Sequence, residues 1–126
     1  MERFALLGSA VLGFFAVALG AFGAHGLKAK LAPLADGAQR LEWWATGTQY
    51  QAIHALALGL VAYLASRSSA TSVGVAAIAF IVGAVLFSGS LYVMTLSGLR
   101  WLGAVTPFGG LAFLVGWAAV FVAALS

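Results

Sequence analysis

Four long apolar segments dominate the chain and restrict what it can fold into. None of them contains Asp, Glu, Lys or Arg, and they run over Phe4–Ala24, Trp43–Ser66, Val73–Leu96 and Leu102–Leu125. Each approaches or exceeds the roughly 20 apolar residues that cross a hydrocarbon core of about 30 Å. Because lipid offers no hydrogen-bond partners, the backbone of such segments must be helical. We therefore predict an all-α integral membrane protein whose single domain, residues 1–126, has four spans.

The composition agrees with a membrane environment. Hydrophobic residues make up 63% of the chain and charged residues 7%, against about 45–50% and 25% in soluble domains. The net charge is +3, but the basic residues form no patch, so nucleic acid is not an expected partner. The absence of cysteine removes disulfides and thiolate chemistry. Membrane lipids are the partners that this composition predicts.

The connections between the segments predict how the helices pair. The second and third connections are short, which makes the helices that they join antiparallel hairpins. In the first connection, Gly23 and Gly26 permit the helix to end at His25. A new helix is predicted to begin after Asp36, with Gln39 at the capping-box spacing. We expect a four-helix bundle with short connections, apart from an interfacial loop between the first two helices.

The first segment and the charges near the membrane edges bear on topology. Phe4–Ala24 exceeds the roughly 7–15-residue hydrophobic region of a signal peptide, so we expect it to remain as a membrane helix. Arg3 and Arg67 flank one predicted edge, and the other is flanked by Lys28, Lys30, Arg40 and Arg100. The positive-inside rule then predicts both termini outside the cytoplasm.

A polar and aromatic stripe runs along the second segment. At 100° per residue its members lie within about 80° of one another; they are Gln39, Trp43, Thr46, Tyr50 and His54, with Gln51 at the edge. A shorter polar stripe in the third segment contains Ser88, Tyr92 and Thr95. We predict that a small molecule or a lipid binds between these two helices, in a cavity lined by Trp43, Tyr50, Gln51, His54, Ser88 and Tyr92.

His54 is the most deeply placed ionisable side chain of the predicted spans, and two interpretations are open. An intramembrane histidine is by default a candidate for binding or proton transfer. Alternatively, a neutral imidazole hydrogen-bonds a hydroxyl such as that of Ser88 or Tyr92 and joins the second and third helices. We expect no enzyme, because no serine lies in a nucleophile elbow and no carboxylate lies within a span.

Metal and cofactor sites are not expected either. The candidate ligands lack the spacing of a metal site; they are His25, Asp36, Glu42 and His54. Early in the fourth segment, Thr106 and Pro107 are followed by two glycines, which predicts a kink or local unwinding. The Thr106 hydroxyl or a neighbour is expected to satisfy the carbonyl that the proline leaves free.

Small residues recur every four positions along the first segment. The two rows are Ala5, Ser9 and Gly13, and Ala16, Gly20 and Ala24. Such rows let helices approach closely, within one bundle or between subunits. Four helices of this length bury little interior surface, so homo-oligomerisation is expected from size, and a membrane-protein partner is the further possibility.

Four short motifs together resemble a known family. They are GAFGAHGL from Gly20, YQAIHALAL from Tyr50, FSGSLY from Phe87, and TPFGG from Thr106 followed by FLVGW from Phe113. Their order and spacing, over nearly the whole chain, resemble the small bacterial inner-membrane family of the YgdD and YwdK type, a domain of unknown function related to small metazoan transmembrane proteins. The resemblance implies a multi-pass inner-membrane protein and no activity. It places in motif positions His25, Gln51, His54, Ser88, Ser90, Tyr92, Thr106 and Pro107.

Three functions are compatible with these patterns. The first is binding of a small molecule or lipid, and the second is a structural or interaction subunit of a homo-oligomer or membrane complex. The third is proton-coupled export, because small multidrug exporters also have four helices. Those exporters use a carboxylate within the membrane, whereas Glu2, Asp36 and Glu42 lie at or beyond the predicted edges. Export is therefore the least expected of the three.

Overall fold

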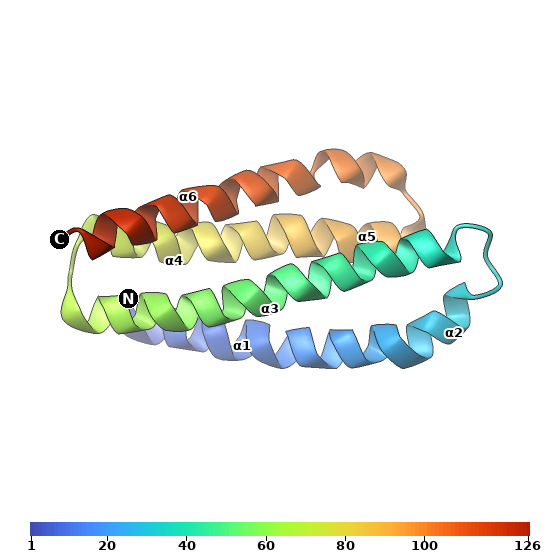
Figure 1. Cartoon of the computed structure of the whole chain (residues 1–126), viewed down its shortest axis with the longest axis horizontal. Coiled ribbons are helices and arrows are strands. Elements are labelled where there is room, and N and C mark those ends of the chain that lie inside the picture. Colours follow the sequence, from blue (N-terminus) through green and yellow to red (C-terminus); the bar gives the residue numbers. More distant parts are fainter.

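A computed structural model describes the whole chain, residues 1–126, as four helical rods (Figure 1). The first rod contains α1 (Glu2–Phe22), the π-helical turn η1 (Gly23–Leu27) and α2 (Lys28–Leu31). The second rod is α3 (Gly37–Arg67). The third contains α4 (Thr71–Gly83), the π-helical turn η2 (Ala84–Ser88) and α5 (Gly89–Ser97). The fourth contains the 3-10 helix η3 (Arg100–Ala104) and α6 (Thr106–Ala124).

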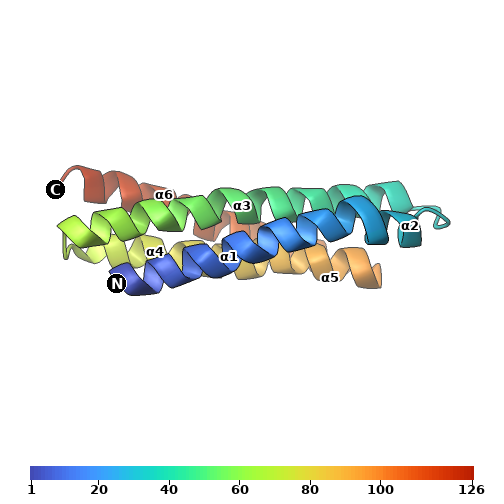
Figure 2. The same ribbon diagram turned by 90° about the horizontal axis from the view of Figure 1, so that it is seen from below.

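The rods lie side by side and alternate in direction. Both termini lie at one end of the molecule, and the α2–α3 and α5–η3 connections lie at the other (Figures 1 and 2). The most extensive contacts join α1 to α3 and α4 to α6, and α3 also contacts α4, η2, α5 and α6. Because α3 touches every other rod, its side chains can link all parts of the structure.

Three of the rods are long and apolar enough to cross a membrane: Glu2–Leu31, Thr71–Ser97 and Arg100–Ala124. The second rod, α3, is also long, with 31 residues, but hydrophilic side chains such as Gln51 and His54 lower its hydropathy. These two side chains are buried against the other rods. The sequence prediction of an all-helical chain is thus confirmed. Three of the four predicted spans are long and apolar enough to cross a membrane, as judged by length and composition.

The apolar core lies between the rods in the half of the molecule that holds the termini. Thirteen buried residues form it, and its largest fully buried members include Phe80, Leu58, Val61 and Val73. The outer faces are apolar as well, with Leu56 78% and Val17 75% exposed. A rod surface that is hydrophobic on every side is typical of helices surrounded by lipid.

The first helix continues past the point where we predicted its end. Gly23 keeps right-handed helical dihedrals, and the chain passes through η1 and α2 before the helix ends at Leu31. The prediction of a helix exit at His25 was therefore wrong. Gly23 instead permits close packing, since a Cβ atom there would overlap Trp44. The Trp44 Nε1–H donates to the Leu19 carbonyl at 2.8 Å, so an indole reaches the backbone just before the π turn, and such insertions distort helices.

The second helix begins where the sequence predicted, with Asp36 in the N-cap position. The capping box does not form, because the side chain of Asp36 makes no capping hydrogen bond. Its Oδ2 accepts instead from Arg40 Nε at 3.0 Å, and Gln39 Oε1 accepts from Arg100 at 2.9 Å. Charged donors from neighbouring arginines thus occupy these two acceptors in place of the helix end.

Glycines let the third and fourth rods approach closely. A Cβ atom on Gly109 would overlap the backbone of Phe87, and one on Gly116 would meet the Phe80 ring at 2.5 Å. The neighbouring Gly110 is different, because its Cβ would lie 3.9 Å from the Phe87 ring, an ordinary contact. Gly109 therefore determines how closely α6 approaches η2.

Candidate functional site

Both ring nitrogens of His54 are hydrogen-bonded, one within α3 and the other to α6. Its Nδ1 lies 2.7 Å from the Tyr50 carbonyl oxygen, and its Nε2 lies 3.1 Å from the Trp117 indole Nε1. A carbonyl can only accept and an indole N–H can only donate, so Nδ1 carries the proton and Nε2 is the acceptor. His54 is therefore held as one neutral tautomer with no free nitrogen.

Aromatic rings enclose the same imidazole. The Phe113 ring is stacked on it at a centroid distance of 3.5 Å and an angle of 6°, and Phe80 lies at 5.4 Å. We predicted that a structural histidine would bond Ser88 or Tyr92 of the third span. The structure corrects this prediction, because the partner is Trp117 of the fourth rod. Burial among rings favours the neutral form, which is the form that both hydrogen bonds require.

Gln51, Ser88 and Tyr92 form a second group of contacts that joins three rods. The Tyr92 hydroxyl donates to Gln51 Oε1 at 2.6 Å, and Gln51 Nε2 donates to the Leu12 carbonyl at 2.9 Å. The Ser88 hydroxyl donates to the Gly47 carbonyl at 2.7 Å. These residues fill the space in which we had predicted a cavity, and they line none of the five main cavities.

Trp43 lies at the edge of the structure rather than beside His54. The Arg100 guanidinium lies 5.2 Å from the centre of its ring. Arg100 also lies 3.6 Å from Asp36 Oδ2. The hydrogen bond from Arg40, together with the positive charges of Arg40 and Arg100, keeps the pKa of Asp36 below its ordinary value, and partial burial opposes this shift. This group ties the α2–α3 connection, α3 and η3 together at one end.

Thr106 and Pro107 mark a change of helix type. The fourth rod begins as the 3-10 helix η3 and becomes α-helical at Thr106, so Pro107 lies in the first turn of α6, where its missing N–H costs little. The Thr106 hydroxyl lies 2.6 Å from that of Ser90, and Ser90 donates to the Phe87 carbonyl. Thr106 therefore donates to Ser90 and links α6 to α5.

A groove opens beside His54, between α3, η2 and α6. Its volume is about 450 Å³, and its lining comprises Tyr50, His54, Phe87, Pro107, Gly110, Leu111, Phe113, Leu114 and Trp117. We call it the His54 groove. Of the predicted site residues, Tyr50 and His54 line it together with Pro107. The sequence analysis did not identify Trp117 as a site residue. Its position far inside a predicted span could have indicated it, because tryptophans of membrane proteins are enriched at the interfaces.

Tyr50 supplies the free polar group of the His54 groove. Its side chain is 39% exposed, and its ring packs on Phe87 at 4.6 Å. Its backbone carbonyl accepts from His54, while its hydroxyl makes no hydrogen bond to the protein. The Tyr50 Cα lies about 10 Å farther along α3 than that of Trp43 at 1.5 Å per residue. This hydroxyl therefore has a hydrogen bond to donate to a ligand.

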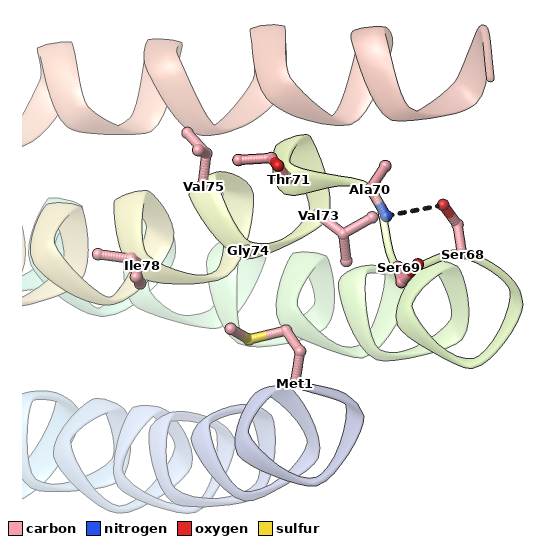
Figure 3. Close-up of a pocket in the computed structure, with 9 residues that line it drawn as sticks. All are labelled: Met1, Ser68, Ser69, Ala70, Thr71, Val73, Gly74, Val75 and Ile78. Carbon is pink, nitrogen blue, oxygen red and sulfur yellow. Dashed lines mark hydrogen bonds between the residues drawn. The ribbon is translucent and has the colours of Figure 1, made fainter.

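Four other main cavities lie elsewhere on the molecule. One of about 430 Å³ lies between Met1 and the α3–α4 connection, where the Ala70 N–H donates to the Ser68 hydroxyl (Figure 3). A second, lined by hydrophobic residues alone, lies between α4 and α6. The remaining two follow the contact between α1 and α3. No three His, Asp or Glu side chains lie close enough to hold a metal ion, and His25 is exposed, away from His54.

These features describe a small helical protein with apolar outer faces and with polar contacts that join its helices, which is the class of multi-helix membrane proteins. The family model described as "Protein of unknown function (DUF423)" matches residues 19–110, and the chain belongs to this family.

Relatives support the same assignment over nearly the full length. The UPF0382 membrane protein YwdK of Bacillus subtilis is 45% identical over 126 residues, covering 99% of this chain and 98% of the relative. The UPF0382 inner membrane protein YgdD of Escherichia coli is 46% identical over 129 residues, covering 98% and 91%. A UPF0382 membrane protein of Staphylococcus epidermidis is 42% identical over 125 residues, covering 99% and 97%. No solved structure matches the chain. The resemblance found in the sequence is confirmed, and the chain is a bacterial membrane protein.

Proposed function

We propose that this protein is a four-span inner-membrane protein that binds a neutral, lipid-soluble molecule in the His54 groove. The observation that carries the proposal is the Tyr50 hydroxyl, which is free and lies in a groove of about 450 Å³. A ligand with a carbonyl or ether oxygen would accept the hydrogen bond that the hydroxyl offers. Its apolar part would lie on Leu111, Leu114 and the aromatic rings.

The neutrality of the ligand follows from the lining. No Asp, Glu, Lys or Arg side chain lines the groove, and both nitrogens of His54 are already hydrogen-bonded. A charged ligand would therefore lie unpaired at membrane depth, where an isolated charge is strongly unfavourable. The groove also has no carboxylate and no free base, so binding rather than a reaction is the role that we assign to it.

The four-span topology requires that α3 also crosses the membrane. Its polar side chains Gln51 and His54 are only 4% and 3% exposed, whereas its exposed positions include Leu56 and Leu60. From Gln51 to Leu60 the exposed side chains of the helix are thus apolar, and its polar side chains are buried. This pattern is expected for a span whose polar residues face the interior of a bundle.

The same topology places both termini on one side of the membrane. The end that carries the α2–α3 and α5–η3 connections holds Lys28, Lys30, Arg40 and Arg100, and the other end holds Arg3 and Arg67. We assign the first end to the cytoplasm by the positive-inside rule. Reporter fusions at each terminus test the assignment, with a periplasmic reporter active at both ends as the expected result.

The ligand test compares wild-type protein with the Tyr50→Phe variant. Both are purified from their own membranes, and neutral lipids extracted from equal amounts of protein are quantified by mass spectrometry. We expect one neutral species enriched in the wild-type sample and reduced at least fivefold in Tyr50→Phe. Tyr63→Phe is the matched control, because Tyr63 lies on the same helix, is 56% exposed and lines none of the main cavities. Equal retention by all three proteins contradicts the proposal.

A further inference from the structure

A second groove follows the contact between α1 and α3 on a different face from the His54 groove. It has a volume of about 330 Å³, and small residues such as Gly20, Ala24 and Ala45 form its walls. Trp44 closes its floor, because its indole packs against Gly23 and donates to the Leu19 carbonyl. We call it the Lys28 groove after the one charged side chain that lines it.

Lys28 is an unpaired cation at the end of this groove. The two ion pairs of the protein both use Asp36, and their cationic partners are Arg40 and Arg100. Lys28 has no carboxylate within ion-pair distance, and its side chain is exposed. An exposed lysine at a membrane edge attracts the anionic groups of the adjacent leaflet. The mouth of the groove is therefore positive and its interior is apolar.

The length of the groove matches one leaflet. From Gly20 to Lys28 the helix rises at most about 12 Å, the value for an α-helix at 1.5 Å per residue, and half of a hydrocarbon core of about 30 Å is about 15 Å. A lipid with its phosphate at Lys28 would thus place the upper part of one acyl chain beside Gly20 and Ala45. Because Gly20 has no side chain and an added Cβ would meet nothing within 4 Å, the space beside it is open to such a chain.

We propose that the Lys28 groove is a binding site for an anionic phospholipid, with the phosphate at Lys28 and an acyl chain between α1 and α3. The charge complementarity at the mouth favours this occupant over a zwitterionic lipid. The separate cavity around Gly13, deeper in the same contact, has no charged side chain in its lining. The site is independent of the His54 groove, so failure of either proposal leaves the other standing.

The test titrates purified full-length protein in detergent with phosphatidylglycerol or phosphatidylcholine and follows the first bound lipid by native mass spectrometry. We expect preference for phosphatidylglycerol, weakened about fivefold by Lys28→Gln, the effect of removing one charge near a headgroup. Lys30→Gln is the control, because Lys30 does not line the groove. Equal losses in both lysine variants would mean diffuse attraction to a basic edge and would overturn the proposal.

A second pair of variants tests whether an acyl chain lies between α1 and α3. Gly20→Leu fills the groove without a steric clash and should abolish the preference, whereas Gly89→Leu should leave it unchanged, since Gly89 also has nothing within 4 Å but lies on α5. Gly13→Leu, in the deeper cavity, should also leave lipid binding unchanged. If Gly20→Leu and Gly13→Leu instead both change the subunit number and neither changes lipid binding, the surface holds a second copy of the chain and the proposal is wrong.

Discussion

The indole Nε1 of Trp117 donates a hydrogen bond to Nε2 of His54 over 3.1 Å, and this contact determines the state of the histidine. With Nδ1 bonded to the Tyr50 carbonyl, the imidazole is neutral and has no nitrogen available to a proton donor or a ligand. The pair explains why His54 can lie only 3% exposed in the interior of the bundle. It also leaves Tyr50 as the polar group that the His54 groove offers to a ligand.

Replacing Trp117 should destabilise the protein, because His54 would lose a hydrogen-bond partner. Trp117→Phe keeps an aromatic ring but removes the donor, which leaves Nε2 without a partner and should lower the free energy of unfolding by about 1–3 kcal/mol. Chemical unfolding in detergent micelles measures the loss. Trp101→Phe is the control, because Trp101 is 66% exposed. A loss no larger than that of the control would show that the indole hydrogen bond is unimportant.

The contact between Tyr92 and Gln51 should appear as a coupling between two rods. A double-mutant cycle with Tyr92→Phe and Gln51→Leu isolates the 2.6 Å hydrogen bond. Because interhelical hydrogen bonds in membrane proteins average about 0.6 kcal/mol and reach about 1.7, we expect a coupling energy in that range. Additive effects of the two substitutions would contradict the assigned bond.

Gly109 and Gly110 should respond differently to the same substitution. Gly109→Ala forces a methyl group onto the Phe87 backbone, whereas the methyl group of Gly110→Ala has room. Overpacking of this kind costs about 1–3 kcal/mol, so Gly109→Ala should lower the thermal midpoint of the purified protein clearly more than Gly110→Ala. Equal midpoints for the two variants would mean that α6 and η2 are not in close contact.

Acid should weaken the group of charges around Asp36. The pKa of Asp36 in the folded protein lies below its ordinary value of 3.8, chiefly because of the hydrogen bond from Arg40. The stabilising contribution is therefore present above pH 3.8 and is lost as the pH falls through the lowered pKa. Thermal midpoints measured from pH 6 to pH 3 should fall less steeply in Asp36→Asn than in wild type. Glu42→Gln, with no ion pair to lose, should follow wild type, and identical slopes for all three proteins would refute the assignment.

The fold was largely accessible from the sequence, because apolar length alone predicts helices in lipid. The end of the first helix could not be predicted, because Gly23 and Gly26 are compatible either with the end of a helix or with close packing against another helix. The deciding contact comes from Trp44, whose indole reaches Gly23 from another rod. A local pattern carries no information about a partner that is distant in sequence.

For the candidate site, too, the sequence could not predict which residues of different helices meet. Helical periodicity correctly placed Tyr50 and His54 on one face of α3, and both line the His54 groove. It grouped them with Ser88 and Tyr92 because those residues form the nearest polar stripe. In the structure Ser88 donates a hydrogen bond to the Gly47 carbonyl, and Tyr92 donates one to Gln51. His54 accepts its interhelical hydrogen bond from Trp117. Which rod faces which polar residue depends on the rotation of each helix, and that rotation is set by tertiary packing.

Photocrosslinking from within the His54 groove tests the proposed function most directly. A photoreactive phenylalanine analogue would replace Leu114, which lines the groove and is 67% exposed. The control position is Val11, which is 52% exposed and lines none of the main cavities. After irradiation of whole membranes, mass spectrometry should find one discrete neutral adduct at Leu114 that disappears when Tyr50→Phe is added, and only mixed phospholipid adducts at Val11. The same mixture of bulk phospholipids at both positions would show that the groove holds no specific ligand.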